Sequence, residues 1–477
     1  MPREIIFREQ YGTLGDKIVY IKAPEQDSVV QLGSSATLST PFSERFVQFF
    51  RQVFLPQGYP RSVSDDYYRY QLWDTLQAFC STITGTLTTQ AVMKGVGVGD
   101  SAATPFAAAI TWILKDGTGM IGRIAFAWFE GTCLDGDCKK WRLFADVLND
   151  MAMGLELLLP LLSSYSTHIL CITTTMKSIV GVAGGATRAA ITQHQAIRNN
   201  MADVSAKDGS QETFVNLCAS LVGIIILATF NEGEFVWQLF TIFTVIHLYA
   251  NYQAVLSLKM VTLNKARLIL LLQTYLGTNM ASSPEVINRN ETVVLGTGMS
   301  DPDLCGFQII LGASLQNVMA YSKVSAEDIK LLASFYHSKK YLIVVDTRGK
   351  RMFVTFLEGE RAVDVIQGYF HAVMLGIAIC ITREHPLMVL SKPQSDSSHI
   401  ACPVHHLQEA LVRLSTTNEV SRNKRIPVVP MMATDYTVSK EFPEFLESIQ
   451  KQGWNIESHH ITVDEWRGEW RDLDKQN

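Results

Sequence analysis

The sequence is poor in charged residues. Asp, Glu, Lys and Arg make up 18% of its 477 residues, against about 25% in ordinary soluble chains. Hydrophobic residues make up 47%, and the mean hydropathy is +0.11. The net charge of -5 argues against a nucleic-acid partner, because binding to phosphates needs a basic face. This composition predicts that part of the chain lies in lipid and that the rest is an ordinary soluble fold.

The sequence also lacks a disulfide framework and a secretory signal. Its eight cysteines are scattered, mostly in apolar runs, which is typical of reduced, buried thiols. The N-terminal residues do not combine a basic stretch with an apolar core. The pattern predicts a protein that is not secreted and that enters its membrane through an internal hydrophobic segment.

Motifs of well-known catalytic and metal sites are missing. There is no Gly-x-Ser-x-Gly and no His-Glu-x-x-His, and Gly117-Thr-Gly119 lacks the Lys-Ser/Thr ending of a phosphate loop. The pair Cys133 and Cys138 has no second ligand pair nearby. We therefore expect no metal and no enzymatic activity.

Two long apolar runs stand out, 213–231 and 235–258. Neither contains a charged residue, and each is long enough to cross a bilayer of roughly 30 Å at about 1.5 Å per residue. Glu232, Gly233 and Glu234 separate the runs, which predicts a helical hairpin in the membrane; a buried hairpin of a soluble protein is the alternative. Residues 151–176, with the single acid Glu156, are a third candidate span. Weaker candidates are residues 72–93, 101–114 and 119–134.

Residues 173–213 form a polar stretch between apolar runs and are expected to connect membrane helices. Cations flank the hairpin on the connector side and at its exit: Lys177, Arg188, Arg198, Lys207, Lys259, Lys265 and Arg267. Positive residues face the cytosol in membrane proteins. The pattern predicts a multi-pass protein of an intracellular or organellar membrane, with its C-terminal half in the cytosol.

The remaining segments complete a fold prediction. Residues 4–22 resemble a β-hairpin, 33–41 a linker, and Phe42–Leu55 an amphipathic helix. Further expected elements are a helix capped by Ser325, a β-hairpin of 341–345 with 352–356, a core helix 361–380, a loop 391–399, helices 404–415 and 439–452, and a strand 454–463. We predict an α-helical membrane domain (42–275), preceded by a β-hairpin and linker (1–41) and followed by an α+β cytosolic domain (285–477).

An internal repeat is possible within the membrane domain. Residues 88–117 and 173–209 share TT, Met-Lys, Val-Gly-Val, Ala-Thr, Ala-Ala-Ile-Thr and Lys-Asp-Gly in the same order. The glycines of the two copies are Gly97, Gly99, Gly181, Gly184 and Gly185. Glycines permit close helix packing in membranes. They also break helices, as at transporter sites. Small-residue packing alone is the simpler alternative.

A ligand site is expected where the two copies meet. The candidate ligand-binding residues are Lys94, Lys177, Gly184, Gly185, Arg188, His194 and Arg198. Cations near helix ends suit an anion. Two alternatives stay open: Lys177 as a Schiff-base lysine for pyridoxal phosphate, and His194 as a structural histidine on an apolar face.

Several segments together resemble the root UV-B-sensitive (RUS) protein family. They are FLPQGYPRSVSDDY (54–67), YQLWDTLQAF (70–79), GVGVG (95–99), LKDGTGMIGRI (114–124), WRLFADVLND (141–150), KSIVGVAGGATRAA (177–190) and RNNMADVSAKDGSQET (198–213). The resemblance is dense over 45–260, and it suggests an animal-type member. It implies links to vitamin B6 homeostasis and UV-B responses, a membrane location in animal members, and partnership between family members. The family offers no catalytic residues to carry over.

Three hypotheses follow. The first is a membrane protein that binds or transports a small, anionic, vitamin B6-related solute. The second is a non-catalytic membrane scaffold that recruits a partner through its C-terminal domain, in contact with membrane lipid and in a homo- or hetero-oligomer with another family member. The third is a pyridoxal-phosphate-linked enzyme; otherwise no cofactor is expected.

Overall fold

The computed structural model describes residues 5–10, 17–22, 29–32, 42–95, 105–229, 234–387, 402–417 and 426–471. The expected linker 33–41, Gly97, Gly99, the hairpin tip at Glu232 and the expected loop 391–399 lie outside these ranges. The chain forms two compact units, Met1–Leu258 with Val293–Leu295, and Lys259–Thr292 with Gly296–Asn477. We call residues 42–258 the helical unit and the second group the C-terminal unit.

The N-terminal residues form the expected hairpin. Strand β1 (Ile5–Gln10) pairs with β2 (Lys17–Lys22) in antiparallel fashion, and β3 (Val29–Leu32), which was not predicted, adds to β2. The amphipathic helix α1 (Phe42–Phe54) is also confirmed. The Phe50 and Phe54 rings of α1 contact the Phe214 ring of the helical unit.

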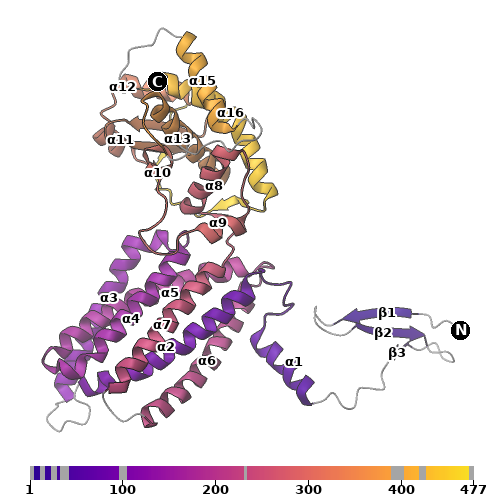
Figure 1. Ribbon diagram of the computed structural model, residues 1–477, viewed down its shortest axis with the longest axis vertical. Helices are drawn as coiled ribbons and strands as arrows, with labels where there is room; N and C mark the ends of the chain where they lie inside the picture. Colours follow the sequence, from indigo (N-terminus) through magenta and orange to yellow (C-terminus); the bar gives the residue numbers. More distant parts are fainter. Residues whose placement is uncertain are drawn as a thin grey trace. The chain divides into compact units, whose positions relative to one another are not determined.

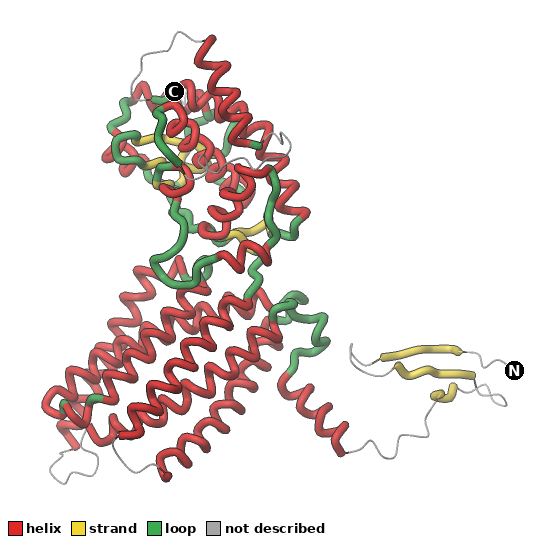
Figure 2. Tube along the Cα trace, viewed as in Figure 1, coloured by secondary structure: helices red, strands yellow, loops and turns green. Residues whose placement is uncertain are grey.

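Long helices that lie side by side build the helical unit (Figure 1). They are α2 (Tyr67–Gly95), α3 (Pro105–Glu130), α4 (Cys138–Leu157), α5 (Ser166–Gln195), α6 (Met201–Thr229) and α7 (Glu234–Ser257). Helix α2 packs against α4, α6 and α7, while α5 packs against α3 and α4. Within the described part of residues 42–257 the chain forms only helices and their connecting turns (Figure 2).

Two predicted spans have different boundaries in the structure. The run 151–176 is not one helix, because α4 ends at Leu157 and short 3-10 turns at 159–161 and 163–165 precede α5. Pro160 lies in the first of these turns, and proline cannot donate the backbone hydrogen bond that a continuing helix requires. Conversely, the weak candidates 101–114 and 119–134 belong largely to the single helix α3.

The polar stretch 173–213 is not a connector. Its first half lies in α5, its second half lies in α6, and only residues 196–200 connect the two helices. Lys177 and Arg188 therefore lie within a helix. The exit cations are also engaged in structure, since Arg267 pairs with Glu291 and Lys265 with Asp301 inside the C-terminal unit.

The glycines of this stretch neither break α5 nor pack closely. Gly181, Gly184 and Gly185 lie inside α5, and a Cβ atom at any of them would meet no atom within 4 Å. A helical glycine costs only about 0.5–1 kcal/mol relative to alanine, which a long helix tolerates. Close approach occurs instead at α3, where a Cβ at Gly122 would lie 2.5 Å from Thr175 of α5.

The described parts of the proposed repeat do not share one backbone path. Residues 88–95 end α2 and residues 105–117 begin α3, whereas residues 173–195 form part of one continuous helix. The sequence similarity therefore has no matching structural repeat in the described residues.

Within the described ranges, four helices are long and apolar enough to cross a membrane: Ser163–Gln195, which includes α5, then α6, α7 and α13 (Ala362–Thr382). The predicted hairpin corresponds to α6 and α7, although α6 begins twelve residues earlier than the apolar run. In α13, 83% of the most apolar stretch is buried within the structure. It is the predicted core helix of the C-terminal unit.

The C-terminal unit combines helices with a mixed sheet, as predicted for an α+β fold. Strands β5 (Gln308–Leu311), β6 (Tyr341–Asp346) and β7 (Arg351–Leu357) have the order β5-β7-β6, with β9 (Arg467–Gly468) pairing with β7. Strands β6 and β7 are antiparallel, while β5 and β9 run parallel to β7. The short strand β4 (Thr262–Leu263) pairs with β8 (Asn455–His459).

Its helices surround this sheet and α13. They are α8 (Lys265–Thr278), α9 (Pro284–Asn290), α10 (Asp301–Cys305), α11 (Leu315–Ser322), α12 (Ala326–Phe335), α15 (Pro403–Thr417) and α16 (Val428–Lys451). The predicted cap is confirmed, because the Ser325 side chain accepts from Asp328 N. The expected helix 439–452 begins eleven residues earlier, at Val428. Pro430 lies in its first turn, where no backbone donor is needed.

Candidate functional site

A polar cavity of about 470 Å³ lies within the helical unit, between α2, α3, α4 and α5. We call it the Lys177 pocket. Its lining residues are Gly85, Thr88, Thr89, Val92, Met93, Trp112, Lys115, Glu156, Leu170, Thr174, Lys177 and Ser178. Most of them come from residues 88–117 and 173–209, the two segments between which a ligand site was expected.

The pocket carries charges of both signs. The Lys177 Nζ donates to Glu156 Oε2 at 2.5 Å, and the Glu156 side chain is only 8% exposed. The Lys115 ammonium lies 3.8 Å from the centroid of the Trp112 ring, which is a cation–π contact. Lys115 also lies 3.6 Å from Asp116, whose side chain is 59% exposed. The nearby carboxylate of Asp116 is thus solvated, and Lys115 is the less neutralised of the two lysines.

Hydroxyl groups supply the uncharged polar surface. The Thr88 and Thr89 hydroxyls donate to the carbonyls of Thr84 and Gly85 in the preceding helical turn. Their hydrogens are thereby used within α2, and their oxygen lone pairs remain as acceptors. Thr174 and Ser178 of α5 also line the pocket.

Glycines shape the walls of the pocket. A Cβ at Gly85 would meet no atom within 4 Å, so the absence of a side chain there leaves the cavity open. At Gly119 of α3, a Cβ would lie 2.7 Å from Ser178 Oγ and 2.9 Å from Thr174 Cγ2. This close approach holds α3 against the lining face of α5, as small residues do in membrane helix packing.

The structure brings only one of the seven predicted ligand residues into this pocket. That residue is Lys177. Lys94 is exposed at the end of α2, one residue beyond the lining residue Met93. Gly184 and Gly185 lie about two turns further along α5.

The other three predicted residues lie at the far end of α5. The side chain of Arg188 pairs with Asp208 at 2.5 Å and with Glu212 at 2.6 Å. His194 Nε2 lies 2.9 Å from Asp66 Oδ2 and has a structural partner. Arg198 is exposed in the turn between α5 and α6. These residues cannot meet Lys177, because 17 residues of helix separate Lys177 from His194 by about 25 Å.

Most of the lining residues were not predicted from the sequence. The strongest available signal was Glu156, which is the single acid in an apolar run; an isolated carboxylate in such a run usually has a partner. Trp112 and Lys115 gave a weaker signal, since a tryptophan three residues before a lysine lies on the same helix face.

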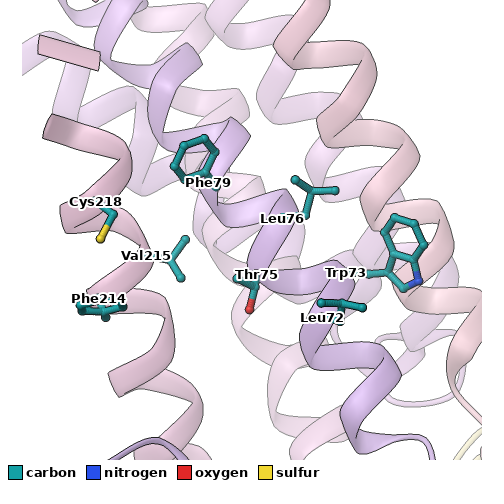
Figure 3. A pocket seen from close by; sticks show the side chains of 8 residues that line it. All are labelled: Leu72, Trp73, Thr75, Leu76, Phe79, Phe214, Val215 and Cys218. Atoms are coloured by element: carbon teal, nitrogen blue, oxygen red, sulfur yellow. The ribbon is translucent and has the colours of Figure 1, made fainter. Parts of the chain in front are cut away.

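A second cavity, of about 480 Å³, is entirely different in character (Figure 3). Leu72, Trp73, Thr75, Leu76 and Phe79 of α2 line one side, and Phe214, Val215 and Cys218 of α6 line the other. Apolar side chains dominate this groove and leave little with which to orient a polar solute. The Lys177 pocket is the better candidate for a specific ligand.

Comparison with known proteins assigns the chain to a family. Residues 41–279 match the family model described as "Vitamin B6 photo-protection and homoeostasis domain", and residues 280–470 match "Root UVB sensitive protein, C-terminal". The match therefore extends through the C-terminal half, where the sequence resemblance was loose. No solved structure matches the chain.

Individual relatives support the same assignment. RUS family member 1 of Dictyostelium discoideum is 44% identical over 340 residues, which is 70% of this chain and 62% of that protein. Protein root UVB sensitive 3 of Arabidopsis thaliana is 38% identical over 359 residues, 72% of this chain and 79% of that protein. The chain thus spans less than two thirds of the first relative's length. It belongs to the root UV-B-sensitive (RUS) protein family.

Proposed function

We propose that this chain is a multi-pass membrane protein that binds, and carries across the membrane, a small anionic solute in the Lys177 pocket. The observation that carries the proposal is a cavity lined by the charged side chains Lys115, Glu156 and Lys177, in a unit whose helices α5, α6 and α7 are apolar enough to cross a membrane. Ionisable groups are costly inside lipid and usually mark a substrate or ion pathway. A tightly packed bundle without such a cavity would instead favour the scaffold.

The pattern of burial supports a lipid-facing helical unit. Only 11% of the most apolar stretch of α6 is buried, and 33% of that of α7. Exposed large side chains include Ile121, Ile124, Trp128, Leu221 and Ile224. In a soluble protein, a buried α6–α7 hairpin would have Leu221 and Ile224 covered by other parts of the chain. Arg198, Lys207 and Lys259 at the helix ends favour a cytosolic C-terminal unit by the positive-inside rule.

The chemistry of the lining suits a vitamin B6 compound. The description of the matching family model names vitamin B6. Such compounds carry a pyridine ring with hydroxyl groups, and some carry a phosphate. The Trp112 face can stack on the ring, Lys115 and Lys177 can meet anionic oxygens, and Glu156 can accept from a protonated ring nitrogen or a hydroxyl.

A ligand-dependent thermal-shift measurement on the purified full chain in detergent tests the proposal. Pyridoxal, pyridoxine, pyridoxal phosphate and inorganic phosphate are separate arms. A ligand at 100 times its Kd stabilises the folded state by about 2.7 kcal/mol. We expect a saturable rise in Tm with at least one vitamer and little with phosphate alone.

Lys177→Met should remove this shift, while Lys94→Met, which changes an exposed lysine outside the pocket, should retain it. Because Lys177→Met leaves the Glu156 carboxylate without its partner, the double variant Lys177→Met/Glu156→Gln keeps the test valid if the single variant is unstable. The absence of a Tm shift in the wild type, or an equal shift in both lysine variants, would refute the proposed site. Either result would favour the scaffold hypothesis, with the protein acting alone or in an oligomer with another family member.

The enzyme hypothesis can be tested with the same protein. Lys177 Nζ donates to Glu156, and an ammonium held in this way has no lone pair to attack an aldehyde. We therefore expect pyridoxal phosphate to produce no absorbance band that depends on Lys177. Such a band, lost in Lys177→Met but not in Lys94→Met, would support a Schiff base at this position.

A further inference from the structure

A second group of polar side chains lies inside the helical unit, apart from the lining of the Lys177 pocket. Arg142, Asp146 and Asp150 follow one another at intervals of four residues on α4 and so share one helix face. Gln77 of α2 and His247 and Asn251 of α7 meet that face. We call these six residues the α4 polar cluster.

The cluster is shielded from solvent. His247 and Asn251 are 0% exposed, and Gln77 and Asp150 are each 6% exposed. The side chains of Arg142 and Asp146 are 15% and 14% exposed. Charges buried to this degree need partners of opposite sign, because few water molecules remain to solvate them.

Histidine 247 lies between the two aspartates of the cluster and contacts one of them at hydrogen-bond distance. Its Nδ1 lies 2.7 Å from Asp150 Oδ2, and its Nε2 lies 3.9 Å from Asp146 Oδ2. The side-chain amides of Gln77 and Asn251 both donate to Asp146 Oδ2. Arg142 is directed elsewhere, to Asp74 of α2 at 3.0 Å.

The charges of the cluster and of Asp74, the partner of Arg142, do not balance. Asp74, Asp146 and Asp150 provide three negative charges, while Arg142 provides one positive charge. With a neutral His247 the net charge of these groups is -2, so two bound protons would neutralise it. With a protonated His247 the net charge is -1, and one more proton would be needed. Among the described residues, Asp146 and Asp150 each form an ion pair with His247 and with no lysine or arginine.

Neighbouring groups do not supply the missing charge. The Tyr70 hydroxyl and the Cys80 thiol of α2 lie within electrostatic reach of Arg142 and Asp150, and neither of them is cationic. Arg188 of α5 is shared between two carboxylates of α6, Asp208 and Glu212.

Unpartnered atoms within the cluster supply an independent observation. Five buried atoms of the cluster have no hydrogen-bond partner within the described structure: Gln77 Oε1, Asn251 Oδ1, Asp150 Oδ1, His247 Nε2 and the donor Arg142 Nε. The oxygens are acceptors without donors. A hydrogen on Asp146 or Asp150 would provide one, since a protonated carboxyl group donates.

We propose that the α4 polar cluster is a proton-binding site in which His247 exchanges protons with Asp146 and Asp150. The exchange starts from a neutral His247 with its hydrogen on Nδ1, a protonated Asp146 and an ionised Asp150. One proton passes from Nδ1 to Asp150 Oδ2, and Nε2 takes up the proton of Asp146 once the two atoms approach from 3.9 Å. The imidazole returns to its starting charge and no electron is transferred. No group of three or more His, Cys, Asp or Glu in the described residues has the arrangement of a metal site.

The site is placed to influence the Lys177 pocket. Both lie along α4, where six residues, or about 9 Å of helix, separate Asp150 from the lining residue Glu156. This link to solute movement rests on the proposed function, whereas the proton site itself does not depend on any solute.

Infrared spectroscopy of the purified full chain in detergent tests the inference directly. Two protons shared among one imidazole and the carboxyl groups place at least one of them on a carboxyl. We therefore expect a carbonyl-stretching band of a buried carboxylic acid at neutral pH. The band should be lost or shifted in Asp150→Asn and unchanged in Asp116→Asn, which alters an exposed carboxylate of the same unit.

His247→Gln gives a second reading if Asp150→Asn fails to fold. Glutamine cannot carry the proton, so the pH midpoint of the band should shift. Absence of the band in folded wild-type protein, or a band that neither variant alters, would overturn the proposal. Loss of the band on adding sodium at constant pH would replace the proton site by a cation site. If the carboxylic-acid band is present but no solute raises Tm, the proton site is supported and only the proposed function is refuted.

Discussion

Helices α6 and α13 have the same mean hydropathy, 1.8 over their most apolar stretches, and opposite surroundings. In α13, 83% of that stretch is buried, by the sheet strands β5, β6 and β7 and by helices α10, α15 and α16. In α6, 11% is buried, and residues such as Leu217, Leu221 and Ile225 are exposed. Composition alone therefore does not distinguish a helix buried in a folded core from one whose apolar side chains are exposed; the chain packed around the helix does.

The two units also differ in the surroundings of a buried histidine. In the C-terminal unit, His371 of α13 is fully buried, and its Nδ1 lies 3.0 Å from the Tyr341 hydroxyl. Burial, aided by the Lys339 charge, lowers the pKa of His371 to about 3. This histidine stays neutral in a sealed core. In the helical unit, by contrast, His247 lies among carboxylates whose charges are not balanced.

The largest expected effect comes from truncating a core residue of α13. Phe370 is 0% exposed and packs on the Phe442 and Phe445 rings. Phe370→Ala should destabilise the C-terminal unit by about 3–5 kcal/mol, measured by hydrogen exchange of the α13 amides. Leu221→Ala, at a site 56% exposed on α6, should change stability by less than about 0.5 kcal/mol. Equal losses of stability at both sites would contradict the difference in burial between α13 and α6.

A charge introduced into α6 should produce the next largest effect. Leu221 lies in the middle of the apolar run, and a lysine near the centre of a membrane span costs about 2.5–3.5 kcal/mol of insertion free energy. Leu221→Lys should therefore reduce the fraction of chain that resists alkaline extraction from membranes, relative to Leu221→Ala. An unchanged fraction would argue that α6 does not face lipid.

Acid should destabilise the C-terminal unit through His371. Its pKa is depressed in the folded state, so the unfolded chain binds the proton first. The stability due to the neutral histidine is complete above the unfolded pKa of about 6.5 and is lost as the pH falls toward 3, at about 1.4 kcal/mol per pH unit. The free energy of unfolding, measured with denaturant at several pH values, should therefore fall less steeply below pH 6.5 in His371→Asn than in the wild type. An equally steep fall in the variant would contradict a buried, neutral His371.

The smallest expected effect concerns the glycines of α5. Gly184→Ala should stabilise the protein slightly, by about 0.5–1 kcal/mol, because alanine is the better helix former and its Cβ would meet no other atom. Gly122→Ala should instead destabilise, since its Cβ would lie 2.5 Å from Thr175. Thermal unfolding of the two variants in detergent compares them, and a loss of stability in Gly184→Ala would indicate an unseen contact at that face.

Much of the fold could be predicted from sequence patterns of short range. The cap at Ser325, the hairpin of β6 and β7 and the core helix α13 depend on neighbouring residues and hydrophobic content. The course of residues 173–213 could not be predicted in this way. The glycines 181–185 and the charged residues beyond them suggested a break, but the penalty of a few glycines is small against the hydrogen bonds of a 30-residue helix.

The candidate site was predictable only in part, for a geometric reason. Lys177 and the meeting of residues 88–117 with 173–209 were identified, whereas Glu156 comes from a third segment and partners Lys177 only through the packing of α4 on α5. Arg188, His194 and Arg198 were grouped with Lys177 because they are near it in sequence. The continuous helix α5 separates Arg188 and His194 from Lys177, and Arg198 lies in the turn beyond it. Arg188 and His194 each have a partner elsewhere.

Labelling of the wild-type chain in membranes by a lipid-soluble carbene reagent tests the central claim most directly. The protein is irradiated in its bilayer, and its peptides are analysed by mass spectrometry. The lipid-facing account predicts strong labelling of the exposed side chains of α6, including Leu221 and Ile224, and none in α13. Unlabelled α6, or equal labelling of both helices, would contradict a lipid-facing helical unit.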